Sequence, residues 1–186
     1  MTNIKVFEND LPEDLDLSNE KLIGLDNEAL GLVLGRDPLT LVQLGLESKN
    51  FYLVKLNRET YNAPNLIKAL SNKNTQFIMH YARQDLLWLK YHLKVQPKNI
   101  FCTKVASKIA RTASSYHGYK DLVKELCGKD ISKKEQQSDW GDPNLSEKQI
   151  KYAASDTEYL FEIRKKLIKM LEREKRIDLF KKSMNV

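Results

Sequence analysis

LIGLDNEAL, at residues 22–30, sets two acids, Asp26 and Glu28, within a short apolar run. Such a run is typical of a strand with a buried face. Because side chains alternate across a strand, both carboxylates project from the same face, close enough to share a cation. Two unpaired anions on a buried face would cost free energy, so the segment predicts a cation site; an edge strand with a solvated face is the alternative.

The sequence around this segment predicts the fold class. Apolar runs at residues 21–28, 39–46 and 51–56 are separated by turn signals at 35–38 and 47–50, as in strands joined by hairpins. From residue 63 onward, helices and strands alternate. We expect helices over 63–70, 82–93, 119–126 and 146–169, one ending at 111 and others in much of the tail, with strands over 75–81 and 100–103. This order predicts an α/β, three-layer fold with a central mixed sheet, in a single domain over residues 1–186.

The composition narrows the class of protein. Of the 186 residues, 41% are hydrophobic and 30% charged, and the mean hydropathy is −0.52, values that fit neither a disordered chain nor a membrane-spanning helix. Residues 1–20 hold six acids and no apolar stretch typical of a signal peptide. Cys102 and Cys127 are too few for a disulfide framework. We therefore expect a cytoplasmic protein with no membrane partner.

The charge is unevenly distributed along the chain. The net formal charge is +6, but residues 1–60 hold 6 basic and 11 acidic side chains, which leaves 25 basic and 14 acidic side chains for residues 61–186. A basic body beside an acidic segment suggests a polyanionic partner that meets an acidic site. Lysine-rich helix faces that are merely solvated are the alternative.

Two further acids occur where helices are expected. Asp85 falls in the first turn of the helix over 82–93, a position that the helix dipole favours for an acid in any protein. Tyr152 and Asp156 are four residues apart and therefore share one face of a later helix. With Asp26 and Glu28, these acids offer oxygen ligands without a local cluster of histidine or cysteine, as Mg²⁺ or Mn²⁺ requires. The set predicts a two-metal phosphodiesterase site.

At this point the chain resembles the DEDD 3′-5′ exonuclease superfamily, in the tyrosine-containing branch that includes ribonuclease D. Beyond the acids and Tyr152, the resemblance rests on HYARQDL at 80–86, ISKKEQQSDW at 131–140, LS at 145–146 and Gln149. NAPNL at 62–66 and FCTKVASK at 101–108 look most like the nanoRNase C subgroup. The resemblance implies degradation of very short RNA, down to dinucleotides, and assembly into a homo-oligomer, a ring-shaped octamer in that subgroup.

The resemblance also implies a ribonuclease H-like fold and roles for the residues. Asp26 would bridge two divalent ions, Mg²⁺ or Mn²⁺, with Glu28 and Asp156 on the nucleophile-side ion and Asp85 on the second. Tyr152 would orient the attacking water. This role agrees with its chemistry, because a tyrosine hydroxyl with a pKa near ~10 is a poor base at neutral pH.

Substrate contacts are expected on both sides of these acids. Leu32 matches the position of an apolar wedge between two bases in related oligoribonucleases; an ordinary core leucine is the alternative. His80 and Arg83 precede Asp85 closely, so we expect them near the substrate phosphate or sugar, although a strand histidine can also be purely structural.

Basic residues provide further candidates for phosphate binding. Lys104, Lys108 and Arg111 have i, i+4, i+7 spacing and predict one basic stripe on a helix, either for phosphates or simply solvated. Lys133 is a phosphate ligand by resemblance. Asn27 and Ala29 depart from the threonine-like residues usual beside the first two acids; Asn27 should face away from them, whereas Ala29 lacks a hydroxyl that could touch substrate.

These expectations lead to a metal-dependent 3′-5′ exoribonuclease that degrades short single-stranded RNA to nucleoside 5′-monophosphates. Trimming of longer structured RNA, as in ribonuclease D, or DNA-tolerant exonuclease activity is the alternative within enzymes. A non-catalytic RNA-binding module on the same fold is the alternative outside enzymes. The end of the chain at Val186, earlier than expected for the nanoRNase C subgroup, weakens the expectation of an octamer and leaves no room for a helical RNA-docking domain.

Overall fold

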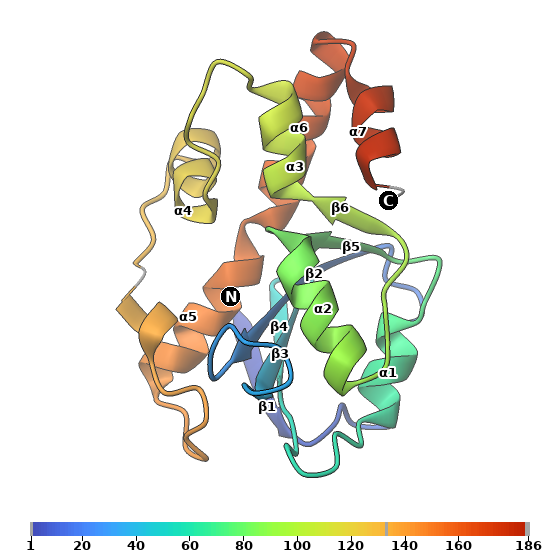
Figure 1. Cartoon of the computed structure of the whole chain (residues 1–186), viewed down its shortest axis with the longest axis vertical. Coiled ribbons are helices and arrows are strands. Elements are labelled where there is room, and N and C mark those ends of the chain that lie inside the picture. Colours follow the sequence, from blue (N-terminus) through green and yellow to red (C-terminus); the bar gives the residue numbers. More distant parts are fainter. Residues whose placement is uncertain (1, 133, 185–186) are drawn as a thin grey trace.

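A mixed sheet forms the centre of the computed structural model, which describes residues 2–132 and 134–184 (Figure 1). Its six strands lie in the order β1-β4-β3-β2-β5-β6. They are β1 (Asn3–Glu8), β2 (Leu22–Ala29), β3 (Leu39–Gly45), β4 (Asn50–Lys55), β5 (Gln76–Met79) and β6 (Ile100–Cys102). Pairing is antiparallel between β2 and β3 and between β3 and β4. It is parallel between β1 and β4, between β2 and β5, and between β5 and β6. The expected α/β fold with a mixed sheet is confirmed.

Helices follow the strands in the described part of the chain. They are α1 (Pro64–Leu70), α2 (Ala82–His92), α3 (Thr103–Ala110), α4 (Tyr119–Leu122), the π-helical turn η1 (Val123–Cys127), the 3₁₀ turn η2 (Lys134–Gln137), α5 (Glu147–Glu158), α6 (Leu160–Arg173) and α7 (Ile177–Met184). Among the described residues, no helix is long and apolar enough to cross a bilayer.

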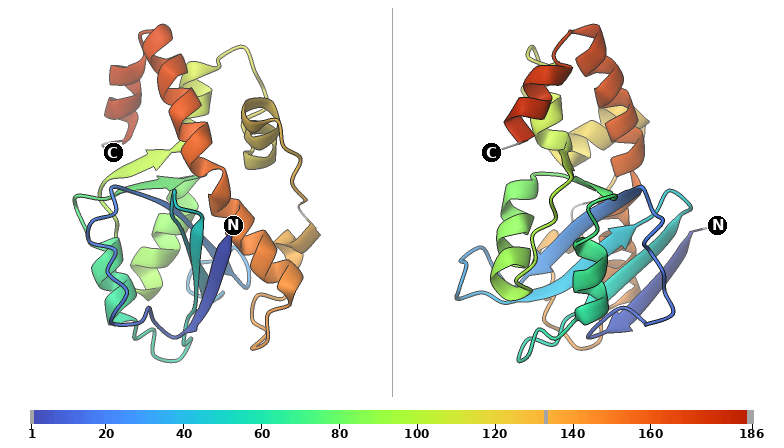
Figure 2. Two further views of the ribbon diagram at one scale, coloured as in Figure 1. Left: turned by 180° about the vertical axis from the view of Figure 1, so that it is seen from behind. Right: turned by 90° about the vertical axis from the view of Figure 1, so that its right-hand side faces the viewer.

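The helices cover both faces of the sheet (Figure 2). On one face, α1 and α2 bury side chains such as Leu66, Leu70 and Leu89 against the sheet. On the other face, α5 contacts β1, β2, β3 and β4, and its Ala153 packs on Leu41 and Leu53. The sheet is therefore the middle of three layers.

A second apolar core lies beyond the β6 edge, where α3, α6 and α7 pack together. Phe101 of β6 contacts Phe180 of α7 with ring centroids 4.8 Å apart. Leu160, Ile163 and Leu167 of α6 are fully buried there. This core fixes α6, and through it the end of α5.

The structure differs from the expected elements most clearly at β1 and in the helix expected over 146–169. β1 was not expected, because its side chains are mostly exposed and no buried face marks it in the sequence; backbone pairing with β4 holds this edge strand. The single helix expected over 146–169 is wrong, since α5 ends at Glu158 and α6 begins at Leu160. At this break the Tyr159 N–H donates to the hydroxyl of Tyr119, a residue outside both helices.

The closest approach of α5 to the sheet depends on two glycines. Gly24 and Gly45 pair across β2 and β3, and both face Thr157 of α5. A Cβ atom at Gly45 would lie 2.5 Å from the Thr157 Oγ1 atom and 2.9 Å from its Cβ atom. Only glycine therefore lets α5 lie this close to β3.

Gly45→Ala should lower the free energy of unfolding by about 1–3 kcal/mol, because the added methyl group overpacks a filled contact. Urea unfolding measures the change. Thr157→Ala removes the Oγ1 atom, so the double variant should be more stable than the sum of the single effects predicts. An unchanged midpoint for Gly45→Ala would show that α5 can move away from the sheet without cost.

Candidate active site

The four acids and Tyr152 line one pocket of about 360 Å³. Asp26 and Glu28 come from β2, at the centre of the sheet, and Asp85 comes from the first turn of α2. Tyr152 and Asp156 come from α5, on the opposite side of the pocket. Residues 130 positions apart in the sequence thus meet, because α5 crosses the sheet above β2.

The pocket raises the pKa of every one of these carboxyl groups. Desolvation raises the pKa of Asp26 to about 7. Desolvation, followed by the charges of Asp26, Asp156 and Asp85, raises the pKa of Glu28 to about 10. For Asp85 and Asp156, desolvation and then the charge of Asp26 raise the pKa well above its usual range. The four acids line one pocket, so each carboxylate raises the pKa of its neighbours.

The donor chemistry of the pocket fits a divalent cation. In residues 2–132 and 134–184, the ion pairs of lysine and arginine involve none of the four acids. The same residues hold no three acid, histidine or cysteine side chains that already converge on one metal position. Carboxylate oxygens are nevertheless the ligands that Mg²⁺ and Mn²⁺ prefer, and a cation would relieve the repulsion between them. The donor chemistry of the four acids therefore fits such an ion.

Tyr152 is a hydrogen-bond donor in this pocket. Desolvation, and then the nearby charges of Asp156, Glu28 and Asp26, raise its pKa above the ordinary value. Asp156 is one helical turn further along α5, and the Tyr152 hydroxyl partly opposes the rise in the pKa of that carboxyl group. The Tyr152 ring lies beside Trp140, with centroids 6.0 Å apart. The hydroxyl is therefore protonated at neutral pH and does not serve as a base.

His80 and Lys104 lie in the same pocket. His80 Nδ1 is 2.9 Å from Thr103 Oγ1, and that hydroxyl donates to the Met79 carbonyl; His80 Nδ1 is therefore the donor to Thr103. Lys104 Nζ lies 4.0 Å from the ring centroid of Tyr81, as in a cation–π contact. Tyr81, with a positive φ of 60°, is the N-cap residue that precedes α2, and it lines the pocket.

The expected basic stripe is not continuous. Lys108 is exposed and Arg83 is exposed, and neither is part of the pocket lining that contains Lys104. Arg111 is paired with Glu125 and donates to the Tyr116 carbonyl, which directs it toward the loop before α4. Lys133 lies outside the described residues, so its expected position is not described.

Leu32 is not a core residue. It is 82% exposed and lines a hollow of about 670 Å³ that adjoins the acids and shares Glu28 and Asp85 with their pocket. The loop that carries it is held by Asp37, which accepts from the Val33 N–H at 2.9 Å. The Arg36 guanidinium lowers the pKa of Asp37 to about 2. An apolar side chain is thus presented at the edge of the acidic pocket.

Tyr119 and Gln43 are among the residues near the acids that sequence reasoning missed. Tyr119 lines the pocket, and nothing in its local sequence distinguishes it. Gln43 is fully buried in β3 and pairs with Asp26 across the ladder. Neither amide atom of Gln43 has a hydrogen-bond partner in the described residues. A lone amide in the apolar run LTLVQLG was a signal that could have identified this position.

Asn27 lines the pocket of the acids, although its strand position predicted that it would face away from them. Asn27 Nδ2 donates to the Asp85 carbonyl at 3.3 Å, so this asparagine links β2 to the first turn of α2. The pairing of β2 with β3 shifts its register between Glu28 and Ala29. Ala29 lines the hollow beside Leu32.

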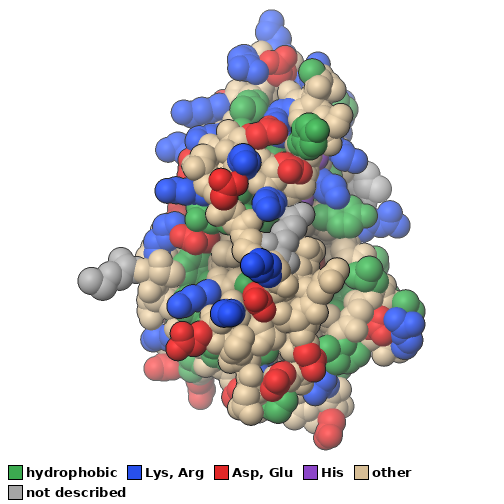
Figure 3. Space-filling model, turned by 90° about the vertical axis from the view of Figure 1, so that its left-hand side faces the viewer, with side chains coloured by type: hydrophobic (Ala, Val, Ile, Leu, Met, Phe, Trp, Pro, Cys, Tyr) green, Lys and Arg blue, Asp and Glu red, His purple; other side chains and the backbone are tan. Residues whose placement is uncertain are grey.

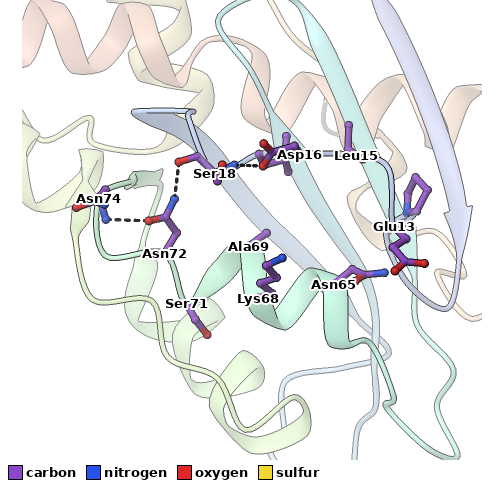
Figure 4. Close-up of a pocket in the computed structure, with 12 residues that line it drawn as sticks. Glu13, Leu15, Asp16, Ser18, Asn65, Lys68, Ala69, Ser71, Asn72 and Asn74 are labelled. Atoms are coloured by element: carbon purple, nitrogen blue, oxygen red, sulfur yellow. Dashed lines mark hydrogen bonds between the residues drawn. The ribbon is translucent and has the colours of Figure 1, made fainter.

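Another cavity, of about 650 Å³, exceeds the pocket of the acids in volume but lies away from it, between residues 12–18 and α1 (Figure 4). Its polar groups bond mostly to one another: Asn72 Nδ2 donates to the Ser18 carbonyl, and the Asn74 N–H donates to Asn72 Oδ1. The Ser18 N–H donates to Asp16. None of the predicted site residues lines this cavity, so its size does not make it the site.

Positive side chains gather on one part of the surface. Figure 3 shows lysine and arginine side chains crowding the upper part of one face, while acidic side chains are more frequent below. The upper part of the molecule holds α3, α4 and α6 (Figure 1). The basic residues are therefore unevenly distributed over this face of the molecule as well as along the sequence.

Comparisons with known proteins agree with this geometry. The model of a family described as 3′-5′ exonuclease matches residues 5–172. A ribonuclease D of Xanthomonas oryzae is 32% identical over 168 residues, which cover 90% of this chain and 46% of the relative. The chain thus spans less than half the length of that relative.

Solved structures are similar over nearly the whole chain. Brucella melitensis NrnC superposes with a TM-score of 0.93 at 36% identity, covering 98% of this chain and 88% of that one. The same protein bound to pGG gives a TM-score of 0.93 at 36% identity, covering 99% and 89%. With bound Mg²⁺ it gives 0.92 at 35% identity, covering 98% and 89%.

Asp156→Asn should raise the free energy of unfolding in EDTA at pH 8 by about 1 kcal/mol, because it removes one of several repelling, desolvated charges. Mg²⁺ should raise the urea midpoint of the parent chain but not that of the variant. Glu59→Gln, at an exposed position, is the control and should stay within about 0.5 kcal/mol. A loss of more than about 1 kcal/mol for Asp156→Asn in EDTA would contradict repulsion in the pocket.

Proposed function

We propose that this chain, which belongs to the 3′-5′ exonuclease family, is a metal-dependent exoribonuclease that degrades short RNA to nucleoside 5′-monophosphates, down to dinucleotides. The observation that carries the proposal is one pocket lined by Asp26, Glu28, Asp85, Asp156 and Tyr152. Such a set of acids is suited to phosphodiester hydrolysis.

The acids would hold two divalent ions, Mg²⁺ or Mn²⁺. When bound, such ions activate a water nucleophile, bind the scissile phosphate and stabilise the leaving 3′ oxygen. The Mg²⁺ bound to the Brucella melitensis NrnC supports a divalent ion here. The acids of this chain contribute negative charge from opposite sides of the pocket, two from β2, one from α2 and one from α5.

Tyr152 would position the attacking water. Its hydroxyl stays protonated at neutral pH because desolvation and nearby carboxylates raise its pKa. It can therefore donate a hydrogen bond, but it cannot remove a proton from water at this pH. The Tyr152 ring lies beside Trp140, and this contact would help to hold the hydroxyl among the acids that line the same pocket.

Lys104, His80 and Leu32 would bind the substrate. Lys104 and His80 face the acids from within the pocket and would contact phosphate or sugar. Leu32, exposed in the adjoining hollow, would pack between the last two bases. Arg83, Lys108 and Arg111 would add phosphate contacts through the positive charge that they bring to the surface. Lys133, outside the described residues, is proposed as a phosphate ligand from the resemblance of its sequence segment.

A short substrate is favoured over a long one. The structure of Brucella melitensis NrnC bound to pGG is similar to 99% of the present chain. Trimming of longer RNA remains the second candidate, favoured by the ribonuclease D relative and by the basic surface in Figure 3. A DNA-tolerant exonuclease and a non-catalytic RNA-binding module are other outcomes of the experiment below.

We also propose a homo-oligomer, with a ring-shaped octamer as its form, in the cytoplasm. Exposed apolar side chains on the Leu32 loop and α2, including Val33, Leu87 and Tyr91, support contact with a second copy. Cys102 and Cys127 are free thiols, as is usual in a reducing compartment.

Labelled RNAs of two, three, seven and about twenty nucleotides, incubated with Mg²⁺, Mn²⁺ or EDTA, test the proposal, because the proposed two-metal reaction stops when EDTA removes the ions. We expect metal-dependent cleavage that is fastest on the dinucleotide, with single-stranded DNA of equal length as the comparison. Fast cleavage of the longest RNA with accumulating dinucleotides would support trimming instead. No cleavage in either metal would leave only the binding module.

Tyr152→Phe should lower kcat by about 10²–10³-fold while the affinity for Mn²⁺ stays within twofold, because the hydroxyl positions water and the acids hold the ions. Asp26→Ala should abolish both cleavage and Mn²⁺ binding. Single-turnover kinetics and Mn²⁺ titration separate the two effects. Loss of Mn²⁺ binding in Tyr152→Phe would show that the positioning role is wrong.

A further inference from the structure

The hydroxyl of Tyr119 stands between two backbone groups of the α5–α6 segment. It donates to the Ser155 carbonyl at 2.7 Å and accepts from the Tyr159 N–H at 3.3 Å. Residues 155 and 159 are four apart, and an uninterrupted α-helix would bond these two groups directly to each other. A side-chain hydroxyl from α4 thus takes the place of one helical hydrogen bond.

This insertion coincides with the break between α5 and α6. A side chain inserted into the hydrogen-bond ladder is a recognised cause of helix bending. Ser155 Oγ donates to the Tyr152 carbonyl and Thr157 Oγ1 donates to the Ala154 carbonyl, bonds that also bend helices. The break therefore has identified side-chain causes, of which only Tyr119 comes from another element.

The turn that Tyr119 opens contains Asp156. Asp156 lies between the two backbone groups that the hydroxyl separates, and its side chain faces the pocket that Tyr119 also lines. The ring of Tyr119 lies beside His80, with centroids 5.7 Å apart, so the tyrosine is held from the pocket side as well. Any change in the direction of this turn would move the Asp156 carboxylate relative to Asp26, which is fixed in β2.

We propose that Tyr119 is a positioning residue that, by opening the last turn of α5, directs the Asp156 carboxylate toward Asp26. This inference rests on the metal site in the proposed function and adds a residue that holds no ion itself. Its hydroxyl acts on the backbone around a ligand, as groups behind metal ligands commonly do. A purely packing role for the ring, in the apolar core of α3 and α6, would need no hydroxyl.

Tyr119→Phe separates these roles, because it keeps the ring and removes only the hydroxyl. We expect the full-length variant to fold in EDTA, as measured by urea unfolding, and to bind Mn²⁺ about tenfold more weakly by electron paramagnetic resonance titration. Tyr159→Phe is the matched control: this tyrosine packs in the same core, and its backbone N–H rather than its hydroxyl meets Tyr119. Its Mn²⁺ affinity should stay within twofold of the parent value.

A measurement on the parent chain covers the case in which Tyr119→Phe does not fold. Coupling between two sites is reciprocal, so Mg²⁺ should slow hydrogen exchange at the Tyr159 amide more than at the Arg111 amide, which bonds within its own helix end. Equal Mn²⁺ affinity in the parent and Tyr119→Phe, or no Mg²⁺ effect at Tyr159, would overturn the inference alone. Failure of the parent to bind either ion would overturn the proposed metal site and the inference with it.

Discussion

The close packing of α5 on β2 and β3 is the contact on which the site depends. Gly24 and Gly45 leave room for Thr157 directly above the sheet, and Asp156 lies next to it in the sequence. One turn earlier, Tyr152 packs near Trp140. A methyl group at Gly24 or Gly45 would push α5 away from the sheet. Tyr152 and Asp156, the α5 residues of the pocket, would move with it. A steric condition at the glycines is therefore also a condition on the chemistry.

This packing gathers acids that repel one another. Desolvation and mutual charge raise the pKa of Glu28 to about 10 and raise the pKa of Asp85 and Asp156. An arrangement that opposes folding in this way is typical of functional sites rather than of structural ion pairs. The apolar cores on both sides of the sheet offset that cost, because Leu25, Leu44 and their neighbours are completely buried.

Much of the fold follows from local patterns. The strands at residues 22–29, 39–45 and 50–55 were predicted from apolar runs and turn signals, since their buried faces mark them. β1 was missed because its exposed edge position leaves no such pattern. The order of the acids predicted one pocket, and the structure places them in one. Leu32, for which a core position was the alternative, is exposed, whereas Arg111 pairs with Glu125 away from the acids.

The sequence by itself predicted the α/β class and identified the four acids and Tyr152 as candidates for one site, because alternation in strands and i, i+4 spacing in helices are local properties of the chain. Only the tertiary structure decided where α5 ends. Its periodicity continues past Tyr159, and the Tyr119 hydroxyl that interrupts it comes from a helix about 40 residues earlier. Likewise, only the strand register places Gln43 beside Asp26. Contacts between segments distant in sequence leave no local period from which they could be predicted.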